Sequence, residues 1–522
     1  MERTLRMRKR GMLVRGGSVM WGLALVGLVL FVAQPAGAIN FELGGKQGTI
    51  MGYINQGVQI GVAGDEFDTK EDFQSAVFQL LLEMQLDLST DLRFFGSVGC
   101  NADWAYPILS DDSEWEDKRF DKSRDEKFIF SHRRDILREF HFTWTPGNWF
   151  FRVGKQIEVW GETIGFRLMD QINPVDQRRG MGDVEFETTI LPIWLVRAEY
   201  YFQPDSSWLQ DLGFEFIFNP NADFRGDEAI VPGNDVAGIW APNLKVPLPP
   251  IFPAGYMHVG SLDWLIDEPD SFDDDGFEYG FRVKAVIQDT IITLNAFYGR
   301  DNSPITINDT SRFPRWERSA DDGRAVFHPP LRGHYPLMRF AGFTLSRDFE
   351  NLYISALGGV APMLTVEAFY AWENTFATDG GNRFKKYDEV RWAIGVDWKI
   401  WWRLINERAA FFINPQFYHR KILNAPRTGL AGTGGFPVRD NNYAATLFIK
   451  TTYFHNKIEP SILWFRDISE RANMFKIQVL YERSDVWNYT LGTLLFNGAK
   501  SEAGFEALTN KDHIYFTVGY RF

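Results

Sequence analysis

Residues 512–522, which end the chain, read DHIYFTVGYRF and alternate between two kinds of side chain. One face carries the apolar and aromatic residues Ile514, Phe516, Val518, Tyr520 and Phe522. The opposite face carries His513, Tyr515, Thr517, Gly519 and Arg521. A helix would repeat its apolar positions every 3.6 residues, whereas these repeat every two. The segment is therefore predicted to be a β-strand with one apolar face.

The same period recurs along the chain, with charged residues on the second face. Residues 277–287 place Phe277, Tyr279, Phe281 and Val283 opposite Glu278, Gly280, Arg282 and Lys284. Residues 391–399 and 475–482 behave in the same way. A soluble sandwich also alternates, but many of these segments run for 9–12 residues, which is long enough to cross hydrocarbon at a tilt. Aromatic residues also gather at the strand ends, as a membrane interface requires.

The connections between these strands alternate between short and long. We place strand starts near residues 49, 75, 91, 137, 149, 190, 211, 277, 290, 336, 363, 389, 408, 442, 457, 472, 487 and 511. Long loops include 220–276, 300–335 and 373–388, and the segment 347–362 must act as an unusually long turn. We therefore predict an all-β protein, a transmembrane antiparallel β-barrel of about 16–18 strands. It would have short periplasmic turns and long extracellular loops.

Composition excludes several other classes. The 522 residues include 46 Phe and 18 Trp, too many large apolar groups for a disordered chain. A single Cys cannot form a disulfide scaffold. The 16% of aromatic residues and the 46 Gly suit a membrane barrel.

Residues 1–38 are predicted to be a secretory signal peptide, which leaves residues 39–522 as the barrel. A basic start is followed by the apolar run Met20 to Ala33 and by Ala36-Gly37-Ala38, a small-residue cleavage site. A membrane-anchor helix is the alternative. Removal of six basic residues and Glu2 leaves 49 basic and 67 acidic residues, a net charge of −18. Such a chain would be repelled by phosphate, so we expect no nucleic-acid partner.

The terminal Phe522 resembles the assembly signal of bacterial outer-membrane barrels, which end an alternating strand with an aromatic residue. This resemblance implies recognition by the barrel-assembly machinery and a location in the cell outer membrane. Membrane lipid and lipopolysaccharide would then be partners. The oligomeric state is left open.

The segment after residue 149 combines a strand with an unusual charged stretch. Arg152, Gly154, Gln156 and Glu158 alternate with Trp149, Phe151 and Val153, so they should point into the lumen. Residues 159–189 then leave the strand and are rich in Arg and Asp. We expect this segment to fold into the lumen, where it would either constrict a pore or plug the barrel.

Within this segment, Gly154-Lys155-Gln156, Trp160-Gly161-Glu162 and Asn173-Pro174-Val175-Asp176 follow one another. The series resembles a domain-of-unknown-function family of Gram-negative outer-membrane β-barrel proteins. The resemblance implies a barrel that is often encoded near exporters of the resistance-nodulation-division type and that is linked to hydrophobic compounds. Lys155 departs from the Arg that we expect at its position, and it loses a bidentate donor. The family implies no catalytic residue.

We expect charged residues to line the pore and set its selectivity, because lumen charges cost little and lipid-facing ones much. The expected pore-lining and constriction residues are Arg152, Lys155, Glu158, Glu162, Asp176, Arg178, Arg179, Arg282, Lys284, Glu367, Arg391, Asp397, Lys399, Lys476 and Glu482.

The main functional hypothesis is a channel of the porin type for small solutes, hydrophobic ones included. A plugged barrel with a structural or surface-binding role is the alternative, and an outer-membrane enzyme is the third. We expect no enzyme, because the sequence lacks a G-x-S-x-G elbow. The eight His lack the spacing of a helical zinc site, so no metal or other cofactor is expected.

Overall fold

The structure of the chain is a computed structural model. It describes residues 37–62, 73–105, 136–163, 167–178, 186–228, 245–247, 256–259, 263–318, 325–350, 360–378, 380–432, 437–498, 505, 508 and 511–522. The predicted signal peptide therefore lies almost entirely outside the described residues.

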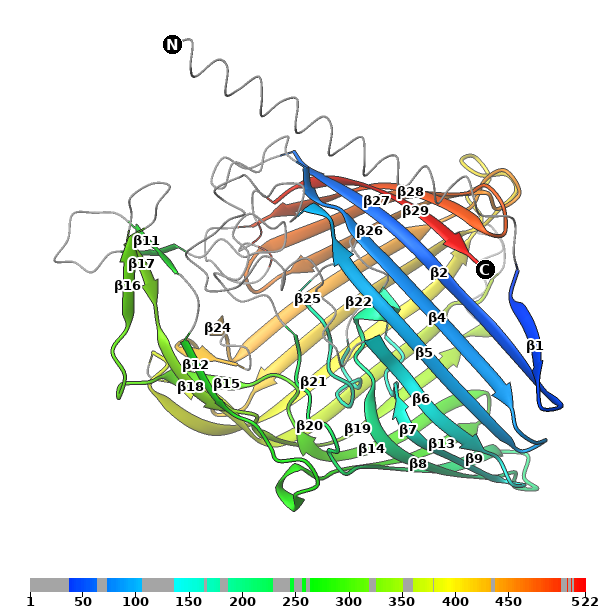
Figure 1. The fold of residues 1–522 in the computed structure, drawn as a ribbon, viewed down its shortest axis with the longest axis horizontal. Coiled ribbons are helices and arrows are strands. Elements are labelled where there is room, and N and C mark those ends of the chain that lie inside the picture. Colours follow the sequence, from blue (N-terminus) through cyan, green and yellow to red (C-terminus); the bar gives the residue numbers. More distant parts are fainter. Residues whose placement is uncertain are drawn as a thin grey trace, which may run out of the picture.

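Eighteen antiparallel strands form a closed barrel, in which each strand pairs with the next barrel strand along the chain (Figure 1). They are β2 (Lys46–Gly61), β4 (Val77–Asp87), β5 (Leu92–Asp103), β6 (Leu137–Trp144), β7 (Trp149–Gln156), β8 (Ile193–Phe202), β9 (Leu209–Asn219), β13 (Glu278–Ile287), β14 (Thr290–Arg300), β19 (Leu337–Asp348), β20 (Met363–Thr378), β21 (Arg383–Ile400), β22 (Phe411–Ile422), β25 (Asn441–Lys450), β26 (Ile458–Asp467), β27 (Ala472–Glu482), β28 (Trp487–Asn497) and β29 (His513–Arg521). Each of the 18 predicted strands matches one of these. The predicted fold class is confirmed.

The barrel closes between its first and last strands. β2 pairs with β29 from Tyr53↔Arg521 to Gly61↔His513. The terminal Phe522 continues this ladder, because its N–H and C=O both bond to the backbone of Gly52, at 3.0 and 2.8 Å. The alternating C-terminal segment therefore leaves no open sheet edge along the closure.

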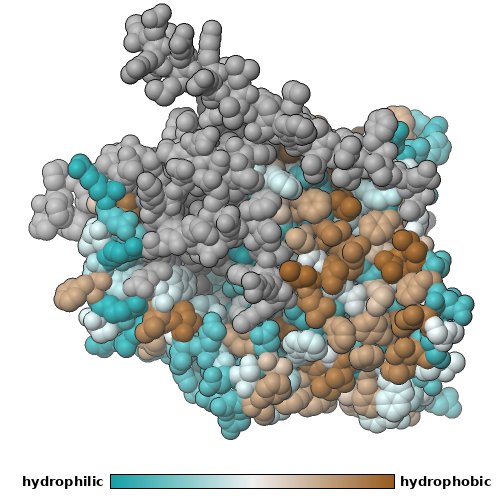
Figure 2. All heavy atoms as spheres, viewed as in Figure 1, coloured by the Kyte–Doolittle hydropathy of each residue, from teal (hydrophilic) through white to brown (hydrophobic). Residues whose placement is uncertain are grey.

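Side chains on each strand alternate between the inside and the outside of the barrel. On β9, Gly213, Glu215, Ile217 and Asn219 are buried, whereas Phe214 and Phe216 are exposed. Figure 2 shows the exposed apolar residues gathered as a broad area over the barrel wall, with hydrophilic residues on the loops. This is the outer surface expected of a barrel in contact with lipid. Among the described residues, no helix is long and apolar enough to cross a membrane.

One predicted loop is wrong. The sequence suggested a loop over residues 373–388, but β20 continues to Thr378 and β21 begins at Arg383, with a bulge between Ala371 and Asn374. The extended hairpin is stable because Phe376 and Tyr387 pack with Ile422 and Leu430. By contrast, no strand is present in the described parts of the turn between β19 and β20, as predicted for residues 347–362.

The long connections carry further small elements. A four-stranded sheet contains β10 (Lys245–Pro247), β11 (Tyr256–Val259), β17 (Ala325–His328) and β16 (Arg315–Arg318), and a three-stranded sheet contains β12 (Asp263–Asp267), β18 (Pro330–His334) and β15 (Ile305–Asn308). Figure 1 shows β11, β16 and β17 standing away from the barrel wall at one end. The remaining elements are β1 (Ile39–Leu43), β3 (Phe73–Ser75), β23 (Leu430–Ala431), β24 (Pro437–Val438), the helical turn α5 (Phe186–Thr189) and the 3₁₀ turn η1 (Asp274–Gly276).

Candidate constriction site

Residues 157–192, here called the inserted segment, connect β7 to β8, and their described parts (157–163, 167–178 and 186–192) contact the inner wall of the barrel. Asn173 holds both ends of the segment together. Its side-chain oxygen accepts the backbone N–H of Glu158 at 2.7 Å, and its side-chain nitrogen donates to the carbonyls of Gln156 and Leu191. The Asn of the Asn-Pro-x-Asp series thus joins the two ends of the segment. Its buried side chain forms hydrogen bonds with backbone groups that water cannot reach.

The backbone of the Trp-Gly-Glu series is also held by hydrogen bonds to a side chain of the inserted segment. The carboxylate of Asp170 accepts the backbone N–H groups of Trp160 and Gly161, both at 2.7 Å. A Cβ on Gly161 would lie only 2.7 Å from an oxygen of Asp170. Glycine is therefore needed where the carboxylate approaches the backbone.

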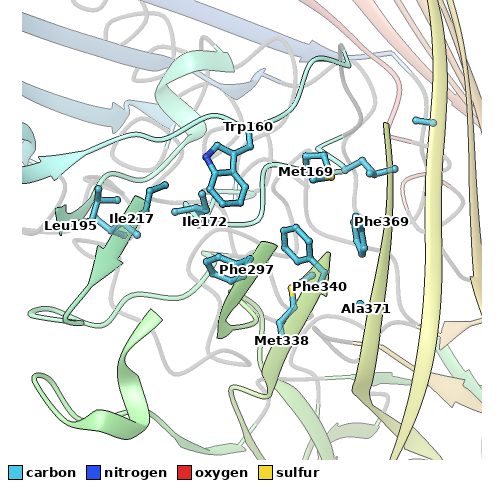
Figure 3. Packing of buried hydrophobic residues seen from close by; sticks show 13 residues of the cluster. Trp160, Met169, Ile172, Leu195, Ile217, Phe297, Met338, Phe340, Phe369 and Ala371 are labelled. Carbon is cyan, nitrogen blue, oxygen red and sulfur yellow. The ribbon is translucent and has the colours of Figure 1, made fainter. Parts of the chain in front are cut away.

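An apolar core fixes the inserted segment to one side of the barrel. Figure 3 shows Trp160, Met169 and Ile172 facing inward-pointing side chains of the wall strands. The buried members from the segment are Trp160, Leu168, Met169 and Ile172. The buried members from the wall are Ile193, Leu195, Ile217, Phe297, Met338, Phe340, Phe369, Ala371 and Ala393. Gly280 on β13 leaves room for the Trp160 ring, since a Cβ there would lie 2.9 Å from it.

A cluster of one arginine and three carboxylates lies beneath Trp160, and we call it the Arg197 cluster. The guanidinium of Arg197 on β8 bonds Glu158 at 2.7 Å, Glu199 at 2.5 Å and Glu215 at 3.3 Å. The indole N–H of Trp160 donates to Glu215 at 2.7 Å. The inserted segment is thus tied to β8 and β9 by charge as well as by apolar contact.

The cluster holds more negative than positive charge. Burial raises the pKa of Glu158, which lies in the inserted segment, to about 8, and the neighbouring Glu215 carboxylate adds to the effect. Arg197 opposes this rise, but one guanidinium is shared among three carboxylates. Glu158 is therefore expected to take up a proton near neutral pH.

Glu367 on β20 provides a second attachment. Its fully buried carboxylate accepts the backbone N–H groups of Glu162 at 2.5 Å and of Thr163 at 2.6 Å. Arg282 on β13 approaches the Glu162 carboxylate at 3.8 Å. Two expected lumen residues, Glu367 and Arg282, therefore hold the inserted segment in place.

A cluster of opposite composition lies further round the wall, and we call it the Glu389 cluster. The fully buried Glu389 on β21 pairs with Arg391 on the same strand and with Arg420 on β22, the latter at 2.7 Å. The side chain of Asn374 on β20 donates to Glu389 at 2.9 Å. This cluster joins three wall strands and contains no residue of the inserted segment.

The far part of the inserted segment is attached to the loop residue Asp227 and to the wall strand β6. Asp227 accepts the N–H of Val175 at 2.7 Å and the hydroxyl of Ser303 at 2.5 Å, and burial raises its pKa. Arg138 on β6 donates to the carbonyls of Thr188 and Ile190, both at 2.9 Å.

The structure brings together only part of the expected set of pore-lining residues. Arg152, Glu158, Glu162, Arg282 and Glu367 lie in or beside the constriction. Asp176 and Arg178 pair with each other at 2.7 Å further along the inserted segment. Lys284, Lys399, Lys476 and Glu482 lie on inward positions of other wall strands, and Asp397 accepts a hydrogen bond from Asn414. Arg179 lies outside the described residues.

Lys155 differs from the expectation. Along β7, Lys155 points to the same face as Trp149 and Val153, which are exposed on the outside of the barrel. Its side chain is buried and does not face an open lumen. Its ammonium donates to the carbonyl of Leu137 at 2.8 Å, where β6 begins. The Gly-Lys-Gln motif suggested a lumen position, but the two-residue period of β7 puts Lys155 on the face of Trp149 and Val153.

Sequence reasoning missed Arg197, Glu199, Glu215 and Arg420. Arg197 and Glu199 alternate with Val196, Ala198 and Tyr200, so strand parity could have placed them in the lumen. The convergence of Glu158 and Glu215 on Arg197 had no signal in the sequence, because these residues are distant along the chain. Within the described residues, no group of His, Cys, Asp and Glu could hold a metal ion.

A cavity of about 800 Å³ lies at the short-turn end of the wall near the cluster. Its inward-facing lining includes Phe150, Tyr201, Gly213 and Lys284. Tyr201 donates its hydroxyl to Glu199, which connects this cavity to the Arg197 cluster.

Comparison with known proteins identifies the family. The model of a family described as a protein of unknown function, DUF1302, matches residues 19–300, which is more than half of the chain, so this protein belongs to that family. The matched range contains the three motifs between Gly154 and Asp176. No curated protein sequence matches significantly.

Several solved barrels are similar at low identity. A BenF-like porin from Pseudomonas fluorescens Pf-5 is 9% identical, with coverage of 92% of this chain and 99% of that one and a TM-score of 0.46. Acinetobacter baumannii OccAB3 is 7% identical, with coverage of 91% and 99% and a TM-score of 0.44. Salmonella typhi OmpF, solved with daunomycin, is 9% identical, with coverage of 93% and 100% and a TM-score of 0.38.

Proposed function

We propose that this family member is an outer-membrane channel of the porin type, through which small solutes pass without catalysis. Its short turns would face the periplasm and its long loops the cell exterior, with the β29 strand serving as the signal for the barrel-assembly machinery. An 18-stranded barrel is wide enough for an aqueous lumen.

The asymmetry of the lumen carries the proposal. The apolar core of the inserted segment packs on strands between β8 and β21. On the opposite side, inward positions in the half nearer the short turns are polar and only partly buried, as at Lys476, Gln478 and Glu482 on β27 and Thr517 on β29. In the half nearer the long loops, Met474, Leu494 and Tyr515 form a buried apolar cluster. A solute would therefore pass between the inserted segment and the wall formed by β25–β29 and β2.

The alternative is a plugged barrel with a structural or binding role. The close packing of the inserted segment on the wall favours this alternative, since the Trp160 side chain is fully buried and its indole N–H is hydrogen-bonded. The two functions make opposite predictions for ion flow.

The decisive experiment is the single-channel conductance of the refolded mature protein in a planar lipid bilayer. Thr517→Trp places a large ring on the inner face of β29, beside Gly57 and Thr490. It should lower the conductance. Val518→Trp, on the outer face of the same strand, is the matched control and should leave the conductance unchanged.

Discrete openings that Thr517→Trp reduces and Val518→Trp does not would support the channel and its path. A folded protein that never conducts would support the plugged barrel. Equal effects of both substitutions would contradict the proposed path.

A further inference from the structure

Two neighbouring turns at the short-turn end of the barrel expose large apolar side chains. They are residues 401–410, between β21 and β22, and residues 451–457, between β25 and β26; we call them the paired turns. Leu404 is 104% exposed, Phe454 71% and Ile405 61%. Exposure of this extent is unusual at a site where nothing else binds.

The paired turns form one hydrogen-bonded unit. The buried side chain of Asn406 donates to the hydroxyl of Thr451 at 2.9 Å and to the carbonyl of Thr452 at 2.8 Å. Thr451 in turn donates to the carbonyl of Ala410 at 3.0 Å. The apolar side chains therefore project from two turns that hydrogen bonds hold together.

The backbone beneath Phe454 is strained. Phe454, His455 and Asn456 have φ values of 51°, 61° and 65°, in the left-handed region that a bulky residue such as Phe rarely adopts. Strain of this kind persists where surrounding contacts enforce it and tends to coincide with function. Here it holds an aromatic ring out from the protein.

The apolar surface of the paired turns continues the outer face of the barrel. Trp398, on the outward parity of β21, is followed by Trp402, whose ring lies 5.1 Å from that of Phe411 at the start of β22. An aromatic row that continues from a lipid-facing wall into a turn matches the interfacial belt of a membrane protein.

Charge distinguishes these turns from the other short turns. Residues 401–410 contain Arg403, Arg408 and Glu407, and residues 451–457 contain Lys457, so each turn has a net charge of +1. The turns 88–91, 145–148, 203–208, 288–289 and 483–486 are each neutral or negative. In a chain as acidic as this one, the positive charge lies beside the exposed apolar groups.

We infer that the paired turns insert into the phospholipid leaflet at this end of the barrel. Leu404, Ile405 and Phe454 would enter the acyl boundary, and Arg403 and Arg408 would contact anionic headgroups. Basic residues beside a buried apolar set are the usual composition of an interfacial anchor. The inference rests on the membrane placement proposed above and not on conduction, so a barrel that conducts no ions would leave it intact.

The test uses the full mature chain with Cys100, which lies on the outer wall strand β5, replaced by Ser. The substitution Leu404→Cys then introduces the one cysteine of the chain, and an environment-sensitive nitrobenzoxadiazole probe is attached to it. The protein is reconstituted in vesicles of phosphatidylcholine and phosphatidylglycerol with brominated acyl chains. Asp485→Cys, exposed in another short turn, is the matched control, and Phe454→Cys is an independent second position.

Probes at residues 404 and 454 should emit at shorter wavelength than the probe at 485 and should be quenched by the brominated lipid. If instead aqueous iodide quenches all three equally and bromine quenches none, the inference is overturned. The apolar side chains of the paired turns would then be available to bind a periplasmic protein.

The charge contact is tested separately. Bromine on phosphatidylglycerol should quench the probe at 404 more than the same amount of bromine on phosphatidylcholine. Arg403→Gln with Arg408→Gln should remove this difference while the folded protein remains heat-modifiable. A difference that persists would overturn the role of the two arginines.

Discussion

The Arg197 cluster and the Glu389 cluster are both buried on the inner wall, but they have opposite compositions. The first shares one guanidinium among Glu158, Glu199 and Glu215. The second shares one carboxylate between Arg391 and Arg420. Excess carboxylates can take up protons, whereas excess arginines cannot lose them. The first cluster should therefore respond to pH and the second should not.

The clusters also differ in what they hold. The Arg197 cluster contains Glu158 and contacts Trp160, so it attaches the inserted segment to β8 and β9. The Glu389 cluster joins β20, β21 and β22 without the segment. We therefore expect the first to affect the constriction and the second to affect the barrel wall.

The largest expected effect is that of Glu389→Gln, which leaves two largely buried guanidinium groups without their shared carboxylate. Removal of one partner from a buried ion pair costs roughly 3–5 kcal/mol. The free energy of unfolding, measured with urea in lipid vesicles, should fall by about this amount at both pH 5 and pH 8. A loss that disappears at pH 5 would contradict the assigned pairing.

Arg197→Met should have the next largest effect, and its size should depend on pH. At pH 8 three carboxylates lose their shared cation, and the loss should be roughly 2–4 kcal/mol. At pH 5 Glu158 is protonated, because burial raises its pKa to about 8, so the loss should be smaller. Urea unfolding at the two pH values checks this, with Lys284→Met as a control on the same wall. A loss that does not vary with pH would remove the distinction between the clusters.

Glu158→Gln should flatten the pH dependence of stability. Because burial raises the pKa of Glu158 to about 8, its contribution is fully present below the pKa of the unfolded chain and is lost as the pH rises through 8. Gln stays neutral, so this loss should be absent in the variant, at a cost of about 1 kcal/mol or less at pH 5. Parallel stability profiles for the variant and the wild type would show that another group titrates.

Lys284→Ala should have the smallest effect on stability, within about 0.5 kcal/mol, because the side chain is exposed on the inner wall outside both clusters. If the protein conducts, the loss of this positive charge should shift ion selectivity towards cations. Reversal potentials in a salt gradient measure the shift, and an unchanged reversal potential would exclude Lys284 from the path.

Strand parity explains both the correct and the incorrect sequence predictions. It placed Arg282, Glu367 and Arg391 on the inner face because each alternates with apolar neighbours over many residues. It could not reveal the hairpin extension through Phe376 and Tyr387, because the apolar residues that stabilise it come from β22 and the following loop. The same alternation puts Lys155 on the face of Trp149 and Val153, although its motif suggested the lumen.

The sequence alone determined the barrel, a count of about 16–18 strands and the face that most side chains occupy, because a two-residue period depends only on neighbouring positions. Only the tertiary structure decided which charges meet. Arg197 binds Glu158 and Glu215, and Trp160 reaches Gly280, across separations that a local pattern cannot encode. Contacts inside a lumen depend on how far each strand is staggered against the next and on where the inserted segment turns. The constriction is therefore a property of the closed barrel.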